Sequence, residues 1–202
     1  MTDDQLEKEI LERIKKKRDF PKTFDQLVSG FETKFSSFDP VTNSFPLKDY
    51  FGVGMGFVSA KQKLLDDNKI KKEWLREYLT TAGNKKIDFK GLYVFIYDDI
   101  PFYVGISKGV VGRIFQHLKG HTHNTSTLAY NIGLIRYELL SGNKHLGARK
   151  EFNFKSEVEP IKKFLLNHKI ALLHIENDEE LYLFEIYCSM KFQTILNKFE
   201  TH

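Results

Sequence analysis

Charged and apolar residues alternate with a helical period through much of the first 88 residues. The pattern over residues 3–18 predicts a helix, and a similar pattern over residues 57–80 predicts a longer one. Neither stretch is rich in β-branched residues, and the stretch between them has the Ser, Asp and Pro content of loops. We therefore expect residues 1–88 to form a mostly helical segment without strands.

The pattern changes at Gly91. Residues 92–97 and 102–106 are dense in β-branched and aromatic side chains, and the turn residues between them predict a β-hairpin. A short apolar run predicts one later strand at residues 170–175. Helices are predicted over 109–118, 125–140, 156–168 and 179–192. We expect an α+β fold in which a small mixed three-stranded sheet, the hairpin plus the later strand, is packed by helices.

Composition narrows the class of protein. Apolar residues make up 41% of the chain and aromatic residues 14%, which is enough to build a core. No apolar run approaches the roughly 18 residues that span a bilayer, and the acidic start has no pattern of a secretory signal. The single cysteine, Cys188, cannot form an internal disulfide, so we expect a cytoplasmic protein. A net charge of +4 is compatible with a polyanionic partner without requiring one.

One acidic residue is conspicuous in the last predicted helix. Glu185 stands within the run Leu181-Tyr182-Leu183-Phe184-Glu185-Ile186-Tyr187-Cys188, where every neighbour is apolar or aromatic. A buried carboxylate costs several kcal/mol unless it is paired or takes up a proton. Glu185 is therefore either a metal ligand or catalytic group, or one half of a buried ion pair with Arg113, Arg136 or a lysine.

The predicted hairpin and the helix after it hold the other candidates. Tyr93 and Tyr103 stand on neighbouring strands, and both rings can point to one face. Gly105 marks a point where the backbone bends or approaches a ligand closely. Arg113 and His117 are four residues apart, so they share one face of a helix, which we expect to be polar. Taken singly, each of these features is more typical of core packing or of a solvated helix face.

In combination, these residues resemble the GIY-YIG nuclease family. Gly91-Leu92-Tyr93 is separated by nine residues from Tyr103-Val104-Gly105. Seven residues then precede Arg113, and three more precede His117. Glu185 in a late helix and Asn197 twelve residues beyond it complete the pattern. The resemblance covers residues 91–199. It implies a metal-dependent endonuclease that hydrolyses DNA, with a domain at 89–202 that follows the helical segment 1–88.

The resemblance also implies roles for these residues. Glu185 would bind one Mg²⁺ or Mn²⁺ ion, because carboxylate oxygens suit hard cations. Arg113 would bind the phosphate, and Tyr103 would take the proton of the attacking water, provided that Arg113, Lys108 or His117 lowers the pKa of its phenol. Tyr93 would either share the hydrogen-bond network around Tyr103 or position the attacking water. Asn197 would brace either the phosphate or a loop of the site. The catalytic set is Tyr93, Tyr103, Arg113 and His117; the substrate-binding set is Gly105, Lys108, His123 and Asn197.

Two features depart from the compact family pattern. His123 fits a second family histidine better than His121 does, and a zinc site made of His117, His121 and His123 is a less favoured alternative. Residues 124–169 resemble an insertion that would widen the DNA contact surface or mediate self-association. The DNA partner is compatible with a monomer or a homodimer, and with a role in restriction, defence, repair or a mobile element.

Two other classes of function remain. Gly105-Ile106-Ser107-Lys108-Gly109 matches the G-x-S-x-G elbow of serine hydrolases, but the antiparallel hairpin and the lack of a suitably placed histidine disfavour it. The second alternative is a nucleic-acid-binding module that keeps the fold without cleaving. No residue of the catalytic set is missing, which favours the enzyme.

Overall fold

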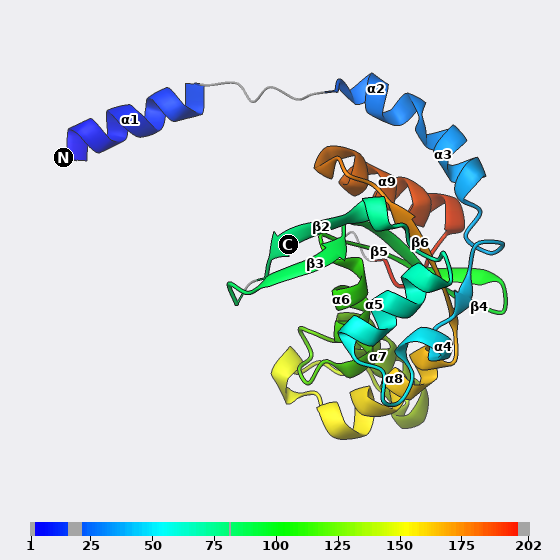
Figure 1. Ribbon diagram of the computed structural model, residues 1–202. Coiled ribbons are helices and arrows are strands. Elements are labelled where there is room, and N and C mark those ends of the chain that lie inside the picture. The colour runs from blue at the N-terminus through cyan, green and yellow to red at the C-terminus, as the bar shows by residue number, and fades with distance from the viewer. Residues whose placement is uncertain (1–2, 16–21, 81, 198–202) are drawn as a thin grey trace.

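The two aromatic runs form the predicted hairpin, strands β4 (Gly91–Tyr97) and β5 (Ile100–Ser107). The computed structural model describes residues 3–15, 22–80 and 82–197 (Figure 1). Strand β6 (Lys169–His174) pairs with β4, and the short strand β1 (Phe45–Pro46) pairs with β6, which gives the order β1-β6-β4-β5. Every one of these pairings is antiparallel. The α+β class is confirmed at this level, whereas the expectation of a mixed three-stranded sheet is wrong.

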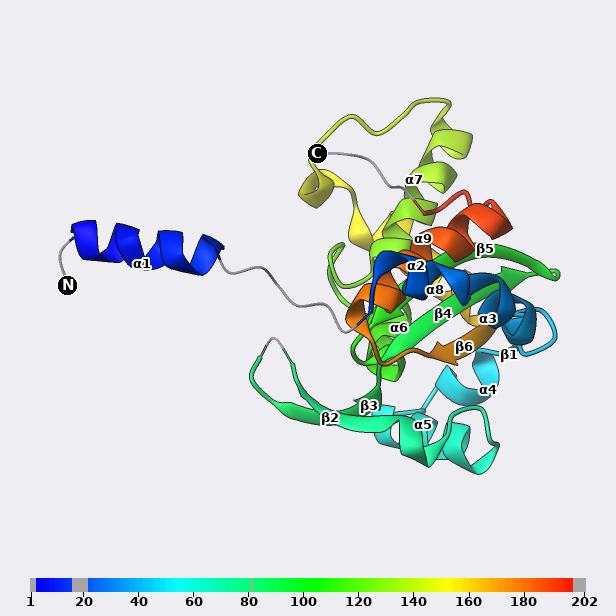
Figure 2. The ribbon, with the colours of Figure 1, turned by 90° about the horizontal axis from the view of Figure 1, so that it is seen from above.

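Helices cover both faces of this sheet (Figures 1 and 2). Side chains of β4 and β6 that point to one face form a core with α3 (Phe31–Phe38) and α9 (Asp178–Phe192), against which α2 (Phe24–Ser29) also packs. The other face forms a core with α4 (Lys48–Phe51), α5 (Phe57–Asp66), α6 (Val110–Lys119), α7 (Thr127–Ser141) and α8 (Glu159–Leu166). Because β4 is covered on both faces, its residues 91–96 are all buried.

The remaining elements are short. Helix α1 (Asp3–Lys15) accounts for the first predicted helix, whose positions 16–18 lie outside the described residues. The 3₁₀ turn η1 (Lys72–Trp74) precedes β2, the 3₁₀ turn η2 (Arg149–Glu151) follows α7, and the π-helical turn η3 (Phe154–Val158) leads into α8. Among the described residues, no helix has both the length and the apolar composition that a membrane span requires.

The prediction that residues 57–80 are one helix is wrong. Helix α5 ends at Asp66, and Asn68 has a left-handed backbone (φ 53°) that stops it. Beyond η1 the chain forms a second, two-stranded antiparallel sheet from β2 (Leu75–Leu79) and β3 (Lys85–Phe89). Its turn contains Gly83, with φ 77°, next to Asn84, and both residues are typical of hairpin turns. The helical spacing of the apolar residues around them led to the wrong prediction. The segment 1–88 therefore contains strands as well as helices.

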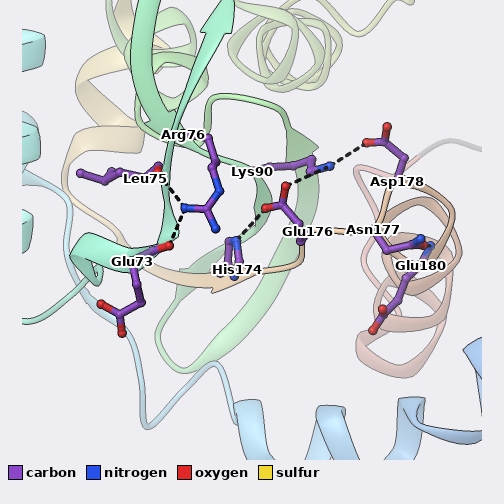
Figure 3. A network of polar contacts seen from close by, with 9 residues as sticks. All are labelled: Glu73, Leu75, Arg76, Lys90, His174, Glu176, Asn177, Asp178 and Glu180. Atoms are coloured by element: carbon purple, nitrogen blue, oxygen red, sulfur yellow. Dashed lines mark hydrogen bonds and ion pairs between the residues drawn. The ribbon is translucent and has the colours of Figure 1, made fainter.

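A polar network joins the base of the β2–β3 hairpin to the main sheet (Figure 3). Lys90, between β3 and β4, forms ion pairs with Glu176 (4.0 Å) and Asp178 (3.3 Å) at the start of α9. The Trp74 ring stacks on His174 of β6, with ring centroids 5.5 Å apart. These contacts fix where the hairpin leaves the sheet.

The hairpin also supplies the N-terminal cap of α6. No neighbouring side chain caps this helix, which starts with Val110 and Val111. Instead the buried carboxylate of Asp88 in β3 accepts hydrogen bonds from the backbone N–H groups of Phe89 (2.7 Å), Val111 (3.2 Å) and Gly112 (2.8 Å). Burial raises the pKa of Asp88, and these three hydrogen bonds oppose the rise. A residue 24 positions upstream thus holds the first turn of α6.

We expect Asp88→Ala to lower the free energy of unfolding by about 1–3 kcal/mol, because it leaves buried N–H groups without an acceptor. Urea denaturation followed by circular dichroism measures this loss. The exposed residue Glu138 of α7 is the control, since Glu138→Ala removes a carboxylate that lies far from any helix N-terminus. Equal stability of Asp88→Ala and the wild type would contradict the role of the cap.

Candidate active site

Tyr93 and Tyr103 lie on one face of the β4–β5 hairpin, as predicted. Tyr93 stands opposite Gly105 and Tyr103 opposite Phe95, so all four residues point to the face that α6 covers. The centroids of the two phenol rings are 6.2 Å apart. Tyr93 is fully buried, whereas Tyr103 is partly exposed. Of the two phenols, Tyr103 is therefore the one that a substrate can reach.

Gly105 leaves the space that the ring of Tyr93 occupies. A Cβ atom at position 105 would lie 2.8 Å or less from Cε2, Cζ and Oη of Tyr93. Gly105 lies within β5 and is buried, so the expected bend at this position is absent. The glycine of the second motif triplet thus makes room for the tyrosine of the first.

His117 is part of the core and does not share a polar face with Arg113, which corrects the sequence expectation. Its side chain is fully buried, and its Nε2 lies 2.8 Å from the hydroxyl oxygen of Tyr93. Burial, followed by the nearby charge of Arg113, lowers the pKa of His117 well below its usual value. The imidazole is therefore neutral near pH 7. Within the described part of the chain its Nδ1 has no hydrogen-bond partner.

Arg113 lies beside this pair with a guanidinium that no carboxylate neutralises. Its Nη1 donates hydrogen bonds to Oε1 of Gln116 (2.8 Å) and to the carbonyl of Thr125 (3.3 Å). Burial raises the pKa of both Tyr93 and Tyr103, and the positive charge of Arg113 opposes that rise. Since no ion pair of Arg113 occurs among the described residues, its charge is available to an anion.

Glu185 reaches the same cluster from α9. Its negative charge acts to raise the pKa of Tyr93 and of Tyr103, so its carboxylate lies within electrostatic range of the two phenols. Burial raises the pKa of Glu185 itself to about 7. Across the described residues, no hydrogen bond or ion pair engages this carboxylate, and Arg136 pairs with Glu157 instead. The alternative of a buried ion pair for Glu185 is therefore excluded for that arginine and for Arg113.

We call Tyr93, Tyr103, Arg113, His117 and Glu185 the central cluster. It brings together all four residues of the predicted catalytic set and the predicted metal ligand. Its carboxylate, desolvated and without a cationic partner, fits a divalent ion that keeps water and substrate phosphate as its remaining ligands. The described residues contain no group of three or more His, Cys, Asp or Glu side chains that could hold an ion alone. A single protein ligand is thus the arrangement that this site offers, and a zinc site of three histidines is absent.

The pKa of Tyr103 departs from the sequence expectation. Burial raises it above the usual value, while the charge of Arg113 and a hydrogen bond from Tyr93 lower it by less. Neither Lys108 nor His117 contributes. The expectation that Arg113, Lys108 or His117 helps to lower the pKa of Tyr103 holds for Arg113, but burial outweighs its effect and the net shift is upward.

The predicted substrate-binding residues separate into two groups. Lys108, in the turn between β5 and α6, is exposed and lines a hollow next to Arg113. Asn197 lies at the open edge of β5, where its Oδ1 accepts from the Val104 N–H (2.8 Å) and its Nδ2 donates to the Val104 carbonyl (2.7 Å). These contacts make Asn197 a brace of β5 at Val104, and its expected role toward a phosphate stays a prediction.

His123 and His121 do not join the central cluster. The Nε2 of His123 lies 2.6 Å from the carbonyl oxygen of Phe152, and its ring packs edge-on against Tyr130 and Phe154. His121 lines a separate hollow with Phe51 and other residues. Neither histidine of this loop therefore contacts the central cluster, where the second family histidine was expected.

The serine-hydrolase alternative fails on topology. Ser107 ends a strand that pairs antiparallel with β4, and its Oγ accepts a hydrogen bond from the Gly109 N–H (3.0 Å). A nucleophile elbow requires parallel strands and an adjacent histidine. Ser107 therefore shapes the turn before α6.

Asp88 is the residue of structural importance to the site that the sequence analysis missed. It caps the helix that carries Arg113 and His117. The signal was present, because Asp88 stands between Ile87 and Phe89 just as Glu185 stands among apolar neighbours. The same argument about buried carboxylates applies to both residues.

Comparison with known proteins gives one family. The family model of the GIY-YIG catalytic domain matches residues 84–202, which is more than half of the chain. No curated protein and no solved structure matches the chain significantly. The match begins next to β3 and includes every residue of the central cluster, while β2 lies before it.

We expect Gly105→Ala to reduce nuclease activity at least tenfold, because the added methyl group displaces the buried ring of Tyr93. Unfolding in urea separates this effect from global loss of the fold. Gly30, where an added Cβ meets nothing within 4 Å, is the matched control. An active Gly105→Ala protein would show that the position of the Tyr93 ring does not matter.

The raised pKa of Glu185 predicts a pH-dependent stability. An unfolded glutamate loses its proton near pH 4.5, whereas the folded site keeps it up to about pH 7. The neutral acid therefore stabilises the metal-free fold below about pH 4.5, and this stabilisation is lost as the pH rises through 7. Between these limits we expect wild type to lose about 3 kcal/mol more than Glu185→Gln. Urea unfolding in EDTA across this range measures the difference, and parallel pH curves would contradict it.

Proposed function

The chain belongs to the GIY-YIG family, and on that premise we propose that it is a metal-dependent endonuclease that hydrolyses phosphodiester bonds in DNA. One observation supports the proposal above the others. The guanidinium of Arg113 and the carboxylate of Glu185, neither neutralised by a partner among the described residues, act on the same two phenols. Each of these charges lacks a partner in the protein, and a phosphate at Arg113 together with a divalent cation at Glu185 would neutralise both.

In this proposal Arg113 binds the scissile phosphate. Its planar guanidinium donates to two phosphate oxygens and stabilises the charge that develops on them during attack. The hydrogen bonds from Arg113 to Gln116 and Thr125 hold the side chain at the surface of α6. Asp88 caps the start of the same helix and so fixes the helix that carries Arg113.

Tyr103 accepts the proton of the attacking water. Tyr93 donates a hydrogen bond to the oxygen of Tyr103 and so stabilises its phenolate, while His117 and Arg113 orient Tyr93. Because burial raises the pKa of Tyr103 in the metal-free protein, ionising its phenol there has a free-energy cost. Positive charge at the site reduces this cost, and Arg113 supplies part of that charge.

Glu185 holds the divalent ion, Mg²⁺ or Mn²⁺, through its carboxylate. When bound, the ion supplies positive charge at the scissile phosphate and at the leaving 3′ oxygen. Glu185 must be ionised to bind a cation, so its pKa of about 7 makes metal binding weaken as the pH falls below neutrality.

A nucleic-acid-binding module without cleavage is the second candidate. Both candidates predict DNA binding, and only the enzyme predicts strand breaks that require a metal. A role in restriction or defence, the homodimer and the cytoplasmic location stay predictions from the sequence.

Plasmid nicking tests the proposal. With Mg²⁺ or Mn²⁺ we expect wild type to nick supercoiled DNA, and EDTA to abolish nicking. Glu185→Gln, Arg113→Ala and Tyr103→Phe should each nick at least about 100-fold more slowly, because each removes an interaction that acts mainly in the transition state. Glu185→Gln should still bind DNA in EDTA.

The controls are exposed residues of the same types. Glu77→Gln and Arg13→Ala alter charges that lie outside the central cluster and should nick at the wild-type rate. Nicking by Glu185→Gln at the wild-type rate would exclude its role as metal ligand. Wild type that binds DNA without nicking it under any of these conditions would favour the binding module.

A further inference from the structure

A hollow of about 700 Å³ opens between the β2–β3 hairpin and α6, directly beside Arg113. The hairpin supplies one wall and α6 the other, and the turn with Lys108 closes one end. Figure 1 shows the hairpin projecting to the left beyond α6. Tyr78 and Leu79 of its lining lie before the residues that the family model matches, so the outer wall belongs partly to this chain's own N-terminal segment.

The two walls are held at a fixed distance. The ring of Tyr78 in β2 packs onto the turn before α6, where a Cβ at Gly109 would lie 2.8 Å or less from three atoms of the ring. Asp88 in β3 binds the first backbone N–H groups of α6. The hairpin therefore cannot swing away from α6 without breaking a buried cap, and the width of the groove is set by the fold.

The groove is basic throughout. Lys86, Lys108, Arg113 and Lys119 line it, and no carboxylate stands among the described residues that do. Lys86 and Lys108 are exposed, and neither has an ion pair in the described part of the chain. Lys85, next to Lys86 on the strand but outside the lining, pairs with Glu77 at 2.8 Å. Because neighbouring side chains on a strand point to opposite faces, β3 presents its unpaired lysine to the groove and its neutralised one away from it.

We propose that this groove binds the phosphate backbone of one DNA strand, as that strand continues from the phosphate held by Arg113, with the β2–β3 hairpin as its outer wall. The inference rests on the proposed function, because it gives the path of the DNA strand beyond the central cluster. Lys86 and Lys108 contact successive phosphates, which position the strand without selecting its sequence. The hairpin is thereby a substrate-binding element outside the central cluster.

Binding measurements in EDTA test the groove without cleavage. We expect the double variant Lys86→Gln/Lys108→Gln to bind a fluorescent DNA duplex about tenfold more weakly at 0.1 M salt. The slope of log affinity against log salt concentration should also become shallower by about 2, since each lost phosphate contact removes about 0.9. Lys85→Gln/Lys155→Gln changes the net charge equally and should keep both the wild-type affinity and the wild-type slope.

The failures of the two proposals are distinguishable. If wild type nicks DNA with Mg²⁺ and the groove variant keeps the wild-type salt slope, the groove is wrong and the enzyme stands. If wild type binds DNA without nicking and the groove variant binds more weakly, the groove stands and the nuclease fails. Equal weakening by the control variant would show a nonspecific charge effect and would overturn the groove.

A label on the hairpin reports directly on the position of the DNA. The one cysteine of the sequence, Cys188, is buried, so a cysteine introduced at the surface takes a thiol-reactive fluorophore selectively. Asn84 lines the groove, and Lys155 does not. We expect DNA to change the emission of a label at Asn84→Cys and not at Lys155→Cys. Unchanged emission at Asn84→Cys with saturating DNA would overturn the role of the hairpin.

Discussion

The buried contact between Tyr93 and His117 joins the sheet to α6, and the geometry of the site depends on it. The phenol occupies the space that Gly105 leaves open on the neighbouring strand, and its hydroxyl meets the imidazole at 2.8 Å. Away from water such a hydrogen bond is strong, and breaking it leaves buried polar atoms unsatisfied. The contact therefore sets the height of α6 above the strands, and with it the distance between Tyr103 and Arg113.

The carboxylates of Asp88, which is buried, and Glu185, which is half-buried, have opposite roles. Asp88 is satisfied by three backbone N–H groups, and its effect is to hold a helix in place. Glu185 has no such partners among the described residues, and burial alone raises its pKa to about 7. A carboxylate left in that condition lowers stability when it ionises, which is the usual cost of a site prepared for a ligand. The same type of residue thus supports the fold at one position and chemistry at the other.

The sequence predicted much of the central cluster because the motif combines local rules. Alternation of side chains along two strands joined by a short turn sends Tyr93 and Tyr103 to one face, and helical spacing places Arg113 near the end of the second strand. Other predictions failed where a distant contact decides. His117 was expected on a solvated face and lies in the core, and the residues of β2 have apolar spacing compatible with either a helix or a strand.

By itself the sequence determined the hairpin, the helices that flank it and the types of chemical group available. Local propensity and periodicity fix these features before any long-range contact forms. Only the tertiary structure decided which groups meet: that Asp88 caps α6, that Asn197 braces β5, and that Glu185 of α9 comes within electrostatic range of the phenols. Burial and charge environment depend on residues far apart in the chain, so the pKa values and the basic groove exist only once it has folded.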